Sequence, residues 1–219
     1  MTWILLILSI ILPILASLYI NNTAKRSSKI ANSKEITGAE VARKLLDKNG
    51  LKESYVVKVK GKLTDHYDPR RKVVRLSTAV YEGTSITSVA VAAHEVGHAL
   101  QDKEGQLYYK IRQFLAPVAS LGSKAAPFAI MIGIFANLTD LLWLGIFLLG
   151  GVLIFQVATL PVEFGASDRA VKELEDNNLI TDQDVPFIKR MLTAAALTYV
   201  AAVLTTALNM VWLILANRD

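Results

Sequence analysis

The sequence predicts a mainly α membrane protein with a small α+β part outside the membrane. Hydrophobic residues make up 53% of the 219 residues, and the mean hydropathy is +0.38. This hydrophobic fraction is above that of an ordinary soluble domain. Charged residues still reach 20%, so the apolar residues must be gathered in segments. We therefore expect a lipid bilayer as a partner.

Four apolar stretches are long enough to cross a bilayer as helices. They cover residues 3–20, 114–136, 141–160 and 192–216. The first has neither a basic start nor a small-residue cleavage site, so we expect a retained anchor rather than a removed signal peptide. Only residues 137–140 separate the second stretch from the third, which predicts a transmembrane hairpin over 114–160.

The distribution of basic residues predicts how the chain is oriented. Lys and Arg outnumber Asp and Glu in residues 21–113, and a basic pair precedes the last apolar stretch. Cytoplasmic loops carry such an excess, so we expect residues 21–113 and 161–191 in the cytoplasm of a bacterial-type cell and both termini outside. Aromatic residues do not alternate with these basic residues, so nucleic acid is not an expected partner.

Residues 21–113 have the patterns of a folded α+β domain. A capping box at Thr37 and Glu40 begins a helix, and a later helix has an apolar part that is too short to span a bilayer. The expected elements are a helix over residues 37–50, strands over 55–60 and 72–77, a turn-rich connection over 65–71, and a helix from 83–85 to about Asp102.

The later helix carries His94-Glu95-Val96-Gly97-His98. Histidines at i and i+4 share one helix face, about 5–6 Å apart at Cβ, so both can bind one zinc ion at about 2.0–2.1 Å. Glu95 can take a proton from zinc-bound water as that water attacks a peptide carbonyl. The alternative is a helix that merely presents two histidines to solvent or to a polar contact. The absence of cysteine excludes thiolate zinc sites and a cysteine nucleophile.

A third protein ligand is needed, and two candidates remain. No histidine follows His98, which excludes the longer three-histidine motif. Glu163 follows two further apolar stretches, so it would return to the side of His98, close to the membrane surface where Pro161 ends the span. It could also be a helix-start carboxylate stabilised by the helix dipole. His66 could instead be a ligand, a turn histidine with a structural hydrogen bond, or a contact to the substrate or transition state.

Some polar residues nearby could orient these ligands. Asp102 lies four residues after His98, and Asp168 follows Glu163. Each could equally be a solvated charge on a helix.

Several longer runs resemble the bacterial neutral zinc metallopeptidases of the YugP type. These runs are residues 63–70, 74–77, 92–101 and 160–164, followed by Ala166-Ser167. The arrangement is also similar to that of membrane-bound heat-shock and CAAX-processing proteases, which place a transmembrane hairpin between H-E-x-x-H and a ligating Glu in E-x-x-A-D. Ser167 stands where those proteins have Asp, so the role of that Asp is not carried over. The resemblance implies zinc, a gluzincin-like site and peptidase activity, with no defined substrate.

We therefore expect a multi-pass, membrane-anchored zinc metalloendopeptidase that acts on membrane or misfolded proteins at the cytoplasmic membrane surface. A non-catalytic zinc-binding assembly factor and an intramembrane protease are the alternatives. The expected organisation is a transmembrane anchor over residues 3–20, a cytoplasmic metallopeptidase domain over 21–113, a transmembrane hairpin over 114–160, a cytoplasmic segment with the third ligand over 161–191, and a transmembrane helix over 192–216.

Overall fold

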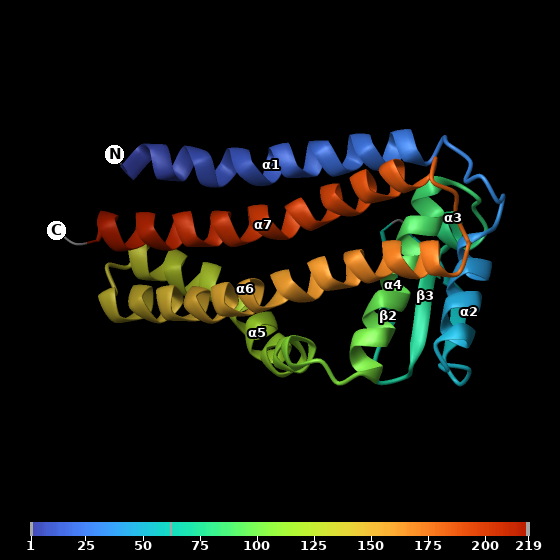
Figure 1. Cartoon of the computed structure of the whole chain (residues 1–219). Coiled ribbons are helices and arrows are strands. Elements are labelled where there is room, and N and C mark those ends of the chain that lie inside the picture. The colour runs from blue at the N-terminus through green and yellow to red at the C-terminus, as the bar shows by residue number, and fades with distance from the viewer. Residues whose placement is uncertain (1, 62, 218–219) are drawn as a thin grey trace. The chain divides into compact units, whose positions relative to one another are not determined.

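Helices make up most of the chain in the computed structural model, which describes residues 2–61 and 63–217 (Figure 1). The helices are α1 (Thr2–Ser27), α2 (Gly38–Lys48), α3 (Thr78–Tyr81), α4 (Ile86–Lys103), α5 (Leu107–Phe135), α6 (Thr139–Asp176) and α7 (Val185–Ala216), and the strands are β1 (Tyr55–Val59), β2 (His66–Asp68) and β3 (Val73–Ser77). The predicted fold class, a mainly α membrane protein with a small sheet, is confirmed.

Four helices of the described chain, α1, α5, α6 and α7, are long and apolar enough to cross a membrane. Each contains one of the predicted apolar stretches, except that α5 ends one residue before the end of the stretch 114–136, and each continues beyond its stretch at one end or both. The added turns have a physical reason in α6 and α7, where they bury apolar side chains. Ala170 and Leu174 of α6, and Ile188 of α7, are fully buried in one hydrophobic core.

The chain divides into two compact units. The apolar unit consists of the chain up to Ser17, Leu107–Pro161 and the chain from Leu197 onward. The sheet unit consists of Leu18–Gln106 and Val162–Ala196.

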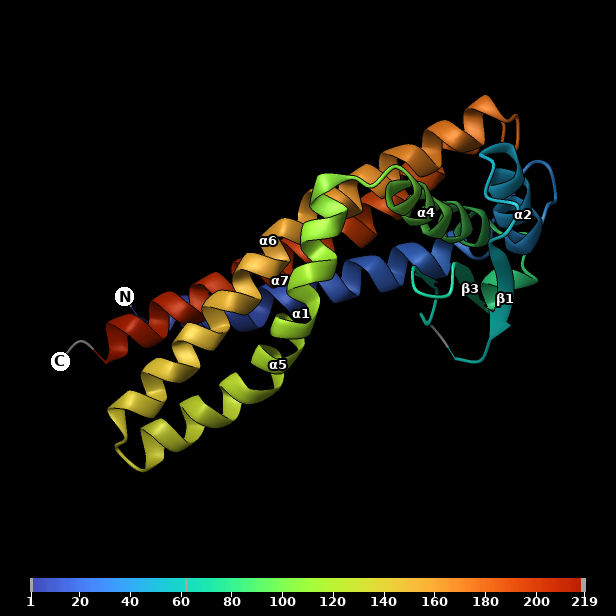
Figure 2. The same ribbon diagram turned by 90° about the horizontal axis from the view of Figure 1, so that it is seen from below.

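In the apolar unit, α5 and α6 form a helical hairpin (Figure 2). Asn137 closes the turn with φ of 53°, a left-handed conformation that asparagine adopts more readily than most residues. Gly133 lets the two helices approach closely, because a Cβ at this position would lie 2.6 Å from the backbone nitrogen of Leu142. Large apolar side chains such as Phe135 and Phe147 are exposed, as expected for helices that face lipid.

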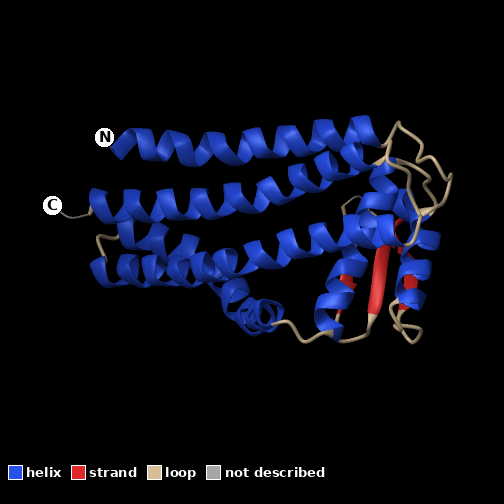
Figure 3. Cartoon of the chain, in the orientation of Figure 1, coloured by secondary structure: helices blue, strands red, loops and turns tan. Residues whose placement is uncertain are grey.

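In the sheet unit, three strands pair in the order β1-β3-β2, with β1 parallel and β2 antiparallel to β3 (Figure 3). The predicted capping box starts α2: Thr37 and Glu40 exchange hydrogen bonds. The predicted strands are present as β1 and β3. The segment predicted as a turn-rich connection contains β2, because three residues pair with β3 and bury Tyr67.

Helices α4 and α6 of the sheet unit approach one another to backbone contact. A Cβ added to Gly97 of α4 would lie 2.6 Å from the carbonyl oxygen of Ala166 of α6, and 3.1 Å from its Cα. Both are backbone atoms, so no side-chain rotation could relieve such a clash. The two helices can therefore come this close only because Gly97 has no side chain.

We expect Gly97→Ala to lower the free energy of unfolding by about 1–3 kcal/mol, the usual cost of overpacking a core. Alanine is intrinsically better than glycine in a helix, so a net loss must come from the contact with Ala166. Thermal unfolding of the detergent-solubilised protein measures it. Gly151→Ala is the matched control, because among the described residues a Cβ there would meet only Val118 Cγ1, at 4.0 Å. Equal stability of Gly97→Ala and wild type would contradict this account of the packing.

Candidate metal centre

Helix α4, which carries the H-E-x-x-H residues, has a capped N-terminus. Ser85 caps the helix, and its hydroxyl accepts a hydrogen bond from the backbone N–H of Ser88 at 3.2 Å. Most of the helix is buried in the core of the sheet unit. This burial holds His94 and His98 on one face with little freedom.

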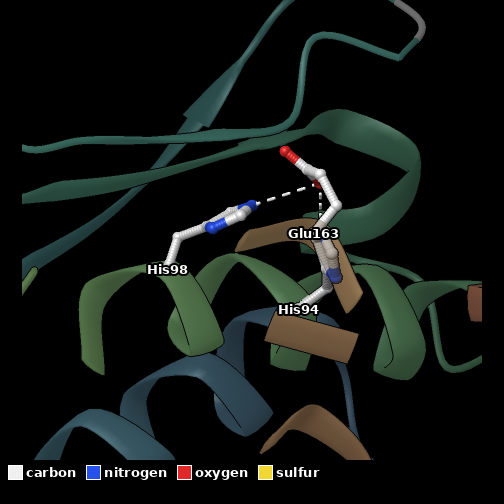
Figure 4. Close-up of side chains that lie close together, drawn as sticks. All are labelled: His94, His98 and Glu163. Carbon is white, nitrogen blue, oxygen red and sulfur yellow. Dashed lines mark hydrogen bonds and ion pairs between the residues drawn. The ribbon is translucent and has the colours of Figure 1, made fainter. Parts of the chain in front are cut away.

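Glu163 of α6 meets both histidines (Figure 4). Its Oε2 lies 3.3 Å from His94 Nε2 and 3.6 Å from His98 Nε2. The two imidazole rings lie 4.7 Å apart at their centroids and nearly perpendicular, at 81°. One donor atom from each of the three residues falls within 4.8 Å of the others, so this group could hold a metal ion. The structure thus brings together the three residues that sequence reasoning selected as ligands.

Glu95 follows His94 and is 8% exposed. Burial, the largest influence, raises the pKa of the Glu95 carboxyl to about 6. The charge of His94 opposes this rise, the negative charges of Glu163 and Asp65 add to it, and a backbone hydrogen bond from Tyr67 in β2 lowers the pKa again. A cation held beside this carboxylate would also lower its pKa.

Each of the two imidazoles has a polar partner on its Nδ1 nitrogen, the one that does not face Glu163. Ser167 Oγ lies 3.3 Å from His94 Nδ1. Gln101 Oε1 lies 2.9 Å from His98 Nδ1. Asp102, which sequence reasoning considered for orienting His98, instead accepts a hydrogen bond from the hydroxyl of Tyr67 at 3.0 Å.

Sequence reasoning assigned no role to Gln101, and it left Asp168 open. Gln101 lies three residues after His98, on the same face of α4, and this spacing was the available signal. Asp168 is exposed on α6.

His66 is not part of the group formed by His94, His98 and Glu163. It is exposed on strand β2, and its Nδ1–H donates to the carbonyl oxygen of Thr64 at 2.7 Å. This hydrogen bond leaves Nε2 as the nitrogen that could contact a bound molecule. A contact with substrate or transition state stays a prediction.

Comparison with known proteins identifies the family of the chain. Residues 2–218 match the model of a family described as "Putative neutral zinc metallopeptidase". The chain belongs to this family. It is also 42% identical over 207 residues to "Putative membrane protease YugP" of Bacillus subtilis (strain 168), covering 93% of this chain and 92% of that protein. No solved structure matches the chain. The predicted family is confirmed, and zinc is its cofactor.

The donor set of His94, His98 and Glu163 fits zinc. Imidazole nitrogens and carboxylate oxygens bind zinc at about 2.0–2.2 Å in a tetrahedral arrangement. Two such donors are then about 3.3–3.6 Å apart, by tetrahedral geometry. The separations of 3.3 Å and 3.6 Å from Glu163 Oε2 to the two imidazole nitrogens agree with this value.

We expect Glu163→Ala to reduce zinc affinity sharply, because it would remove one of three protein ligands. His66→Ala should leave about one zinc ion per chain, since His66 lies outside the group. The measurement is metal content by mass spectrometry after dialysis of each purified variant. Zinc retained in Glu163→Ala and lost in His66→Ala would transfer the ligand role to His66.

Proposed function

We propose that this family member is a membrane-anchored zinc metalloendopeptidase. His94, His98 and Glu163 hold the zinc ion, and Glu95 is the general base. The observation that carries the proposal is a buried carboxylate, Glu95, beside a group of three side chains spaced as zinc ligands.

Each residue has a distinct role in peptide hydrolysis. Zinc held by the three ligands would polarise the substrate carbonyl and lower the pKa of a water molecule. Glu95 is placed to accept a proton from the water that attacks the carbonyl and to return it to the leaving amine. Ser167 contacts Nδ1 of His94 and Gln101 contacts Nδ1 of His98, and these contacts orient the two imidazole rings. The general base and the two histidine ligands lie on neighbouring turns of α4, so one helix keeps their geometry.

The buried position of Glu95 favours an enzyme over a zinc-binding assembly factor. A structural zinc site uses four protein ligands and closes the coordination shell. Burying a carboxylate without a bond to the metal costs free energy, and a purely structural site gains nothing from it. An intramembrane protease is less well supported, because α4 packs against the sheet and is not among the four helices suited to a membrane.

We further propose that the site lies at the cytoplasmic membrane surface and acts on membrane or misfolded proteins. Leu160 ends the third apolar stretch, and Glu163 comes three residues later in the same helix. This is a rise of about 4.5 Å along an α-helix. The basic residues of 21–113 support the cytoplasmic side. A substrate would then be cut just outside its own membrane-spanning segment.

We expect Glu95→Gln to keep its zinc and its thermal stability but to lose hydrolysis of an unfolded casein-like substrate by roughly 10²–10⁴-fold, because the amide cannot accept a proton. Chelator-treated wild type should be equally inactive and should recover when zinc is restored. The matched control is Glu82→Gln, an exposed carboxylate paired with Lys58. An active Glu95→Gln protein, free of contaminating protease, would refute the mechanism.

The proposed orientation can be tested in this cysteine-free chain. Single cysteines at Lys60, Thr139 and Asp182 would be labelled with a membrane-impermeant reagent on intact cells. We expect labelling at Thr139 alone, and labelling of the other two only after permeabilisation. Labelling at Lys60 and Asp182 but not at Thr139 would reverse the orientation. Opposite results at Lys60 and Asp182 would make a shared zinc site impossible.

A further inference from the structure

Gln101 is the polar side chain buried most completely beside the candidate metal centre, with 0% of its surface exposed. Burying an amide is unfavourable unless both its ends are hydrogen-bonded. Both ends are bonded here. Oε1 lies 2.9 Å from His98 Nδ1, and Nε2 donates to the backbone carbonyl oxygen of Val162 at 2.8 Å.

The Val162 carbonyl determines the direction of every hydrogen in this chain of bonds. A carbonyl oxygen can only accept, so the amide must turn its NH₂ group towards it. The amide oxygen then faces His98 and can only accept as well. His98 must therefore carry its hydrogen on Nδ1, and in the neutral ring Nε2 carries the lone pair. That nitrogen is the one that lies 3.6 Å from Glu163 Oε2.

The same amide also connects the two helices that supply the ligands. Val162 immediately precedes Glu163 in α6, whereas Gln101 lies one turn after His98 in α4. Gly165 leaves room for this bridge, since a Cβ there would lie 3.1 Å from Gln101 Nε2. One side chain thus acts on a histidine ligand and on the backbone next to the carboxylate ligand.

We propose that Gln101 is a positioning residue of the zinc site. It holds His98 in the tautomer whose Nε2 can bind the metal, and it ties the Glu163 segment of α6 to α4. The inference rests on the proposed ligand set and extends it. Ser167 cannot do the same for His94, because a hydroxyl can either donate or accept and so does not select a tautomer.

The test compares Gln101→Met, Gln101→Glu and wild type. Methionine has a similar length without an amide, so it removes both hydrogen bonds and keeps most of the volume. Glutamate still accepts from His98 Nδ1–H but cannot donate to Val162. Gln106→Met is the control, a glutamine just beyond α4 whose side chain donates a hydrogen bond to the nearby Glu104. Zinc affinity is measured by competition with a chromophoric chelator, and the His98 tautomer by ¹⁵N-histidine NMR of the zinc-free protein.

A chain with three histidines makes the NMR assignment simple, because His66→Ala leaves only His94 and His98. We expect His98 to carry its hydrogen on Nδ1 in the wild type and in Gln106→Met. In Gln101→Met we expect a mixture of tautomers and a loss of zinc affinity of about 10–100-fold, as for other partners of metal-bound histidines. Gln101→Glu should keep Nδ1 protonated and bind zinc with an affinity between those of Gln101→Met and wild type.

Two results would overturn the inference. One is an unchanged His98 tautomer in folded Gln101→Met. The other is a zinc affinity of Gln101→Glu equal to the wild-type value, which would remove the tie to Val162. If Gln101→Met does not fold, the Gln101→Glu affinity decides. Failure of the wild type itself to bind zinc would refute the proposed metal centre instead, so the two failures are distinguishable.

Discussion

The site depends on how closely helices α4 and α6 approach each other. Glu163 can reach both histidines only if the two helix backbones touch, because its side chain is short. Gly97 lies between His94 and His98 in α4, and it packs directly on the backbone of Ala166 in α6. The contact is therefore at the centre of the ligand set. A larger residue at Gly97 would move the carboxylate away from both imidazoles at once.

This packing forces charged groups into the interior. Glu163 is 1% exposed and Glu95 is 8% exposed, and two carboxylates so close together repel each other and lose hydration. The raised pKa of Glu95 records part of that cost. A divalent cation would offset it by attracting both carboxylates, so folding of the site and metal binding should stabilise each other. The same features that destabilise the empty arrangement therefore favour its metal-bound form.

Much of this arrangement could be predicted from the sequence, because it follows from the length of apolar runs and from the spacing of residues along a helix. Long apolar runs specify the four membrane-type helices, and the i, i+4 histidines specify their shared face. Counting apolar stretches placed Glu163 on the side of His98, as one of two candidates for the third ligand. Three features could not be predicted from the sequence. Strand β2 is too short to show a period, the continuation of α6 through Pro161 depends on tertiary burial, and Gln101 acquires its role only through contact with Val162.

Helix α6 continues through Pro161, and Glu163 is therefore held on a helix. Proline removes one backbone hydrogen bond from a helix interior, yet α6 extends to Asp176. The turns after Pro161 bury Val162, Ala166, Ala170 and Leu174 at helical spacing, and this burial offsets the lost bond. Glu163 is thus borne on the helix that also contains an apolar stretch, rather than on a loop. Because a helix backbone is less mobile than a loop, Glu163 keeps its orientation towards the two histidines of α4.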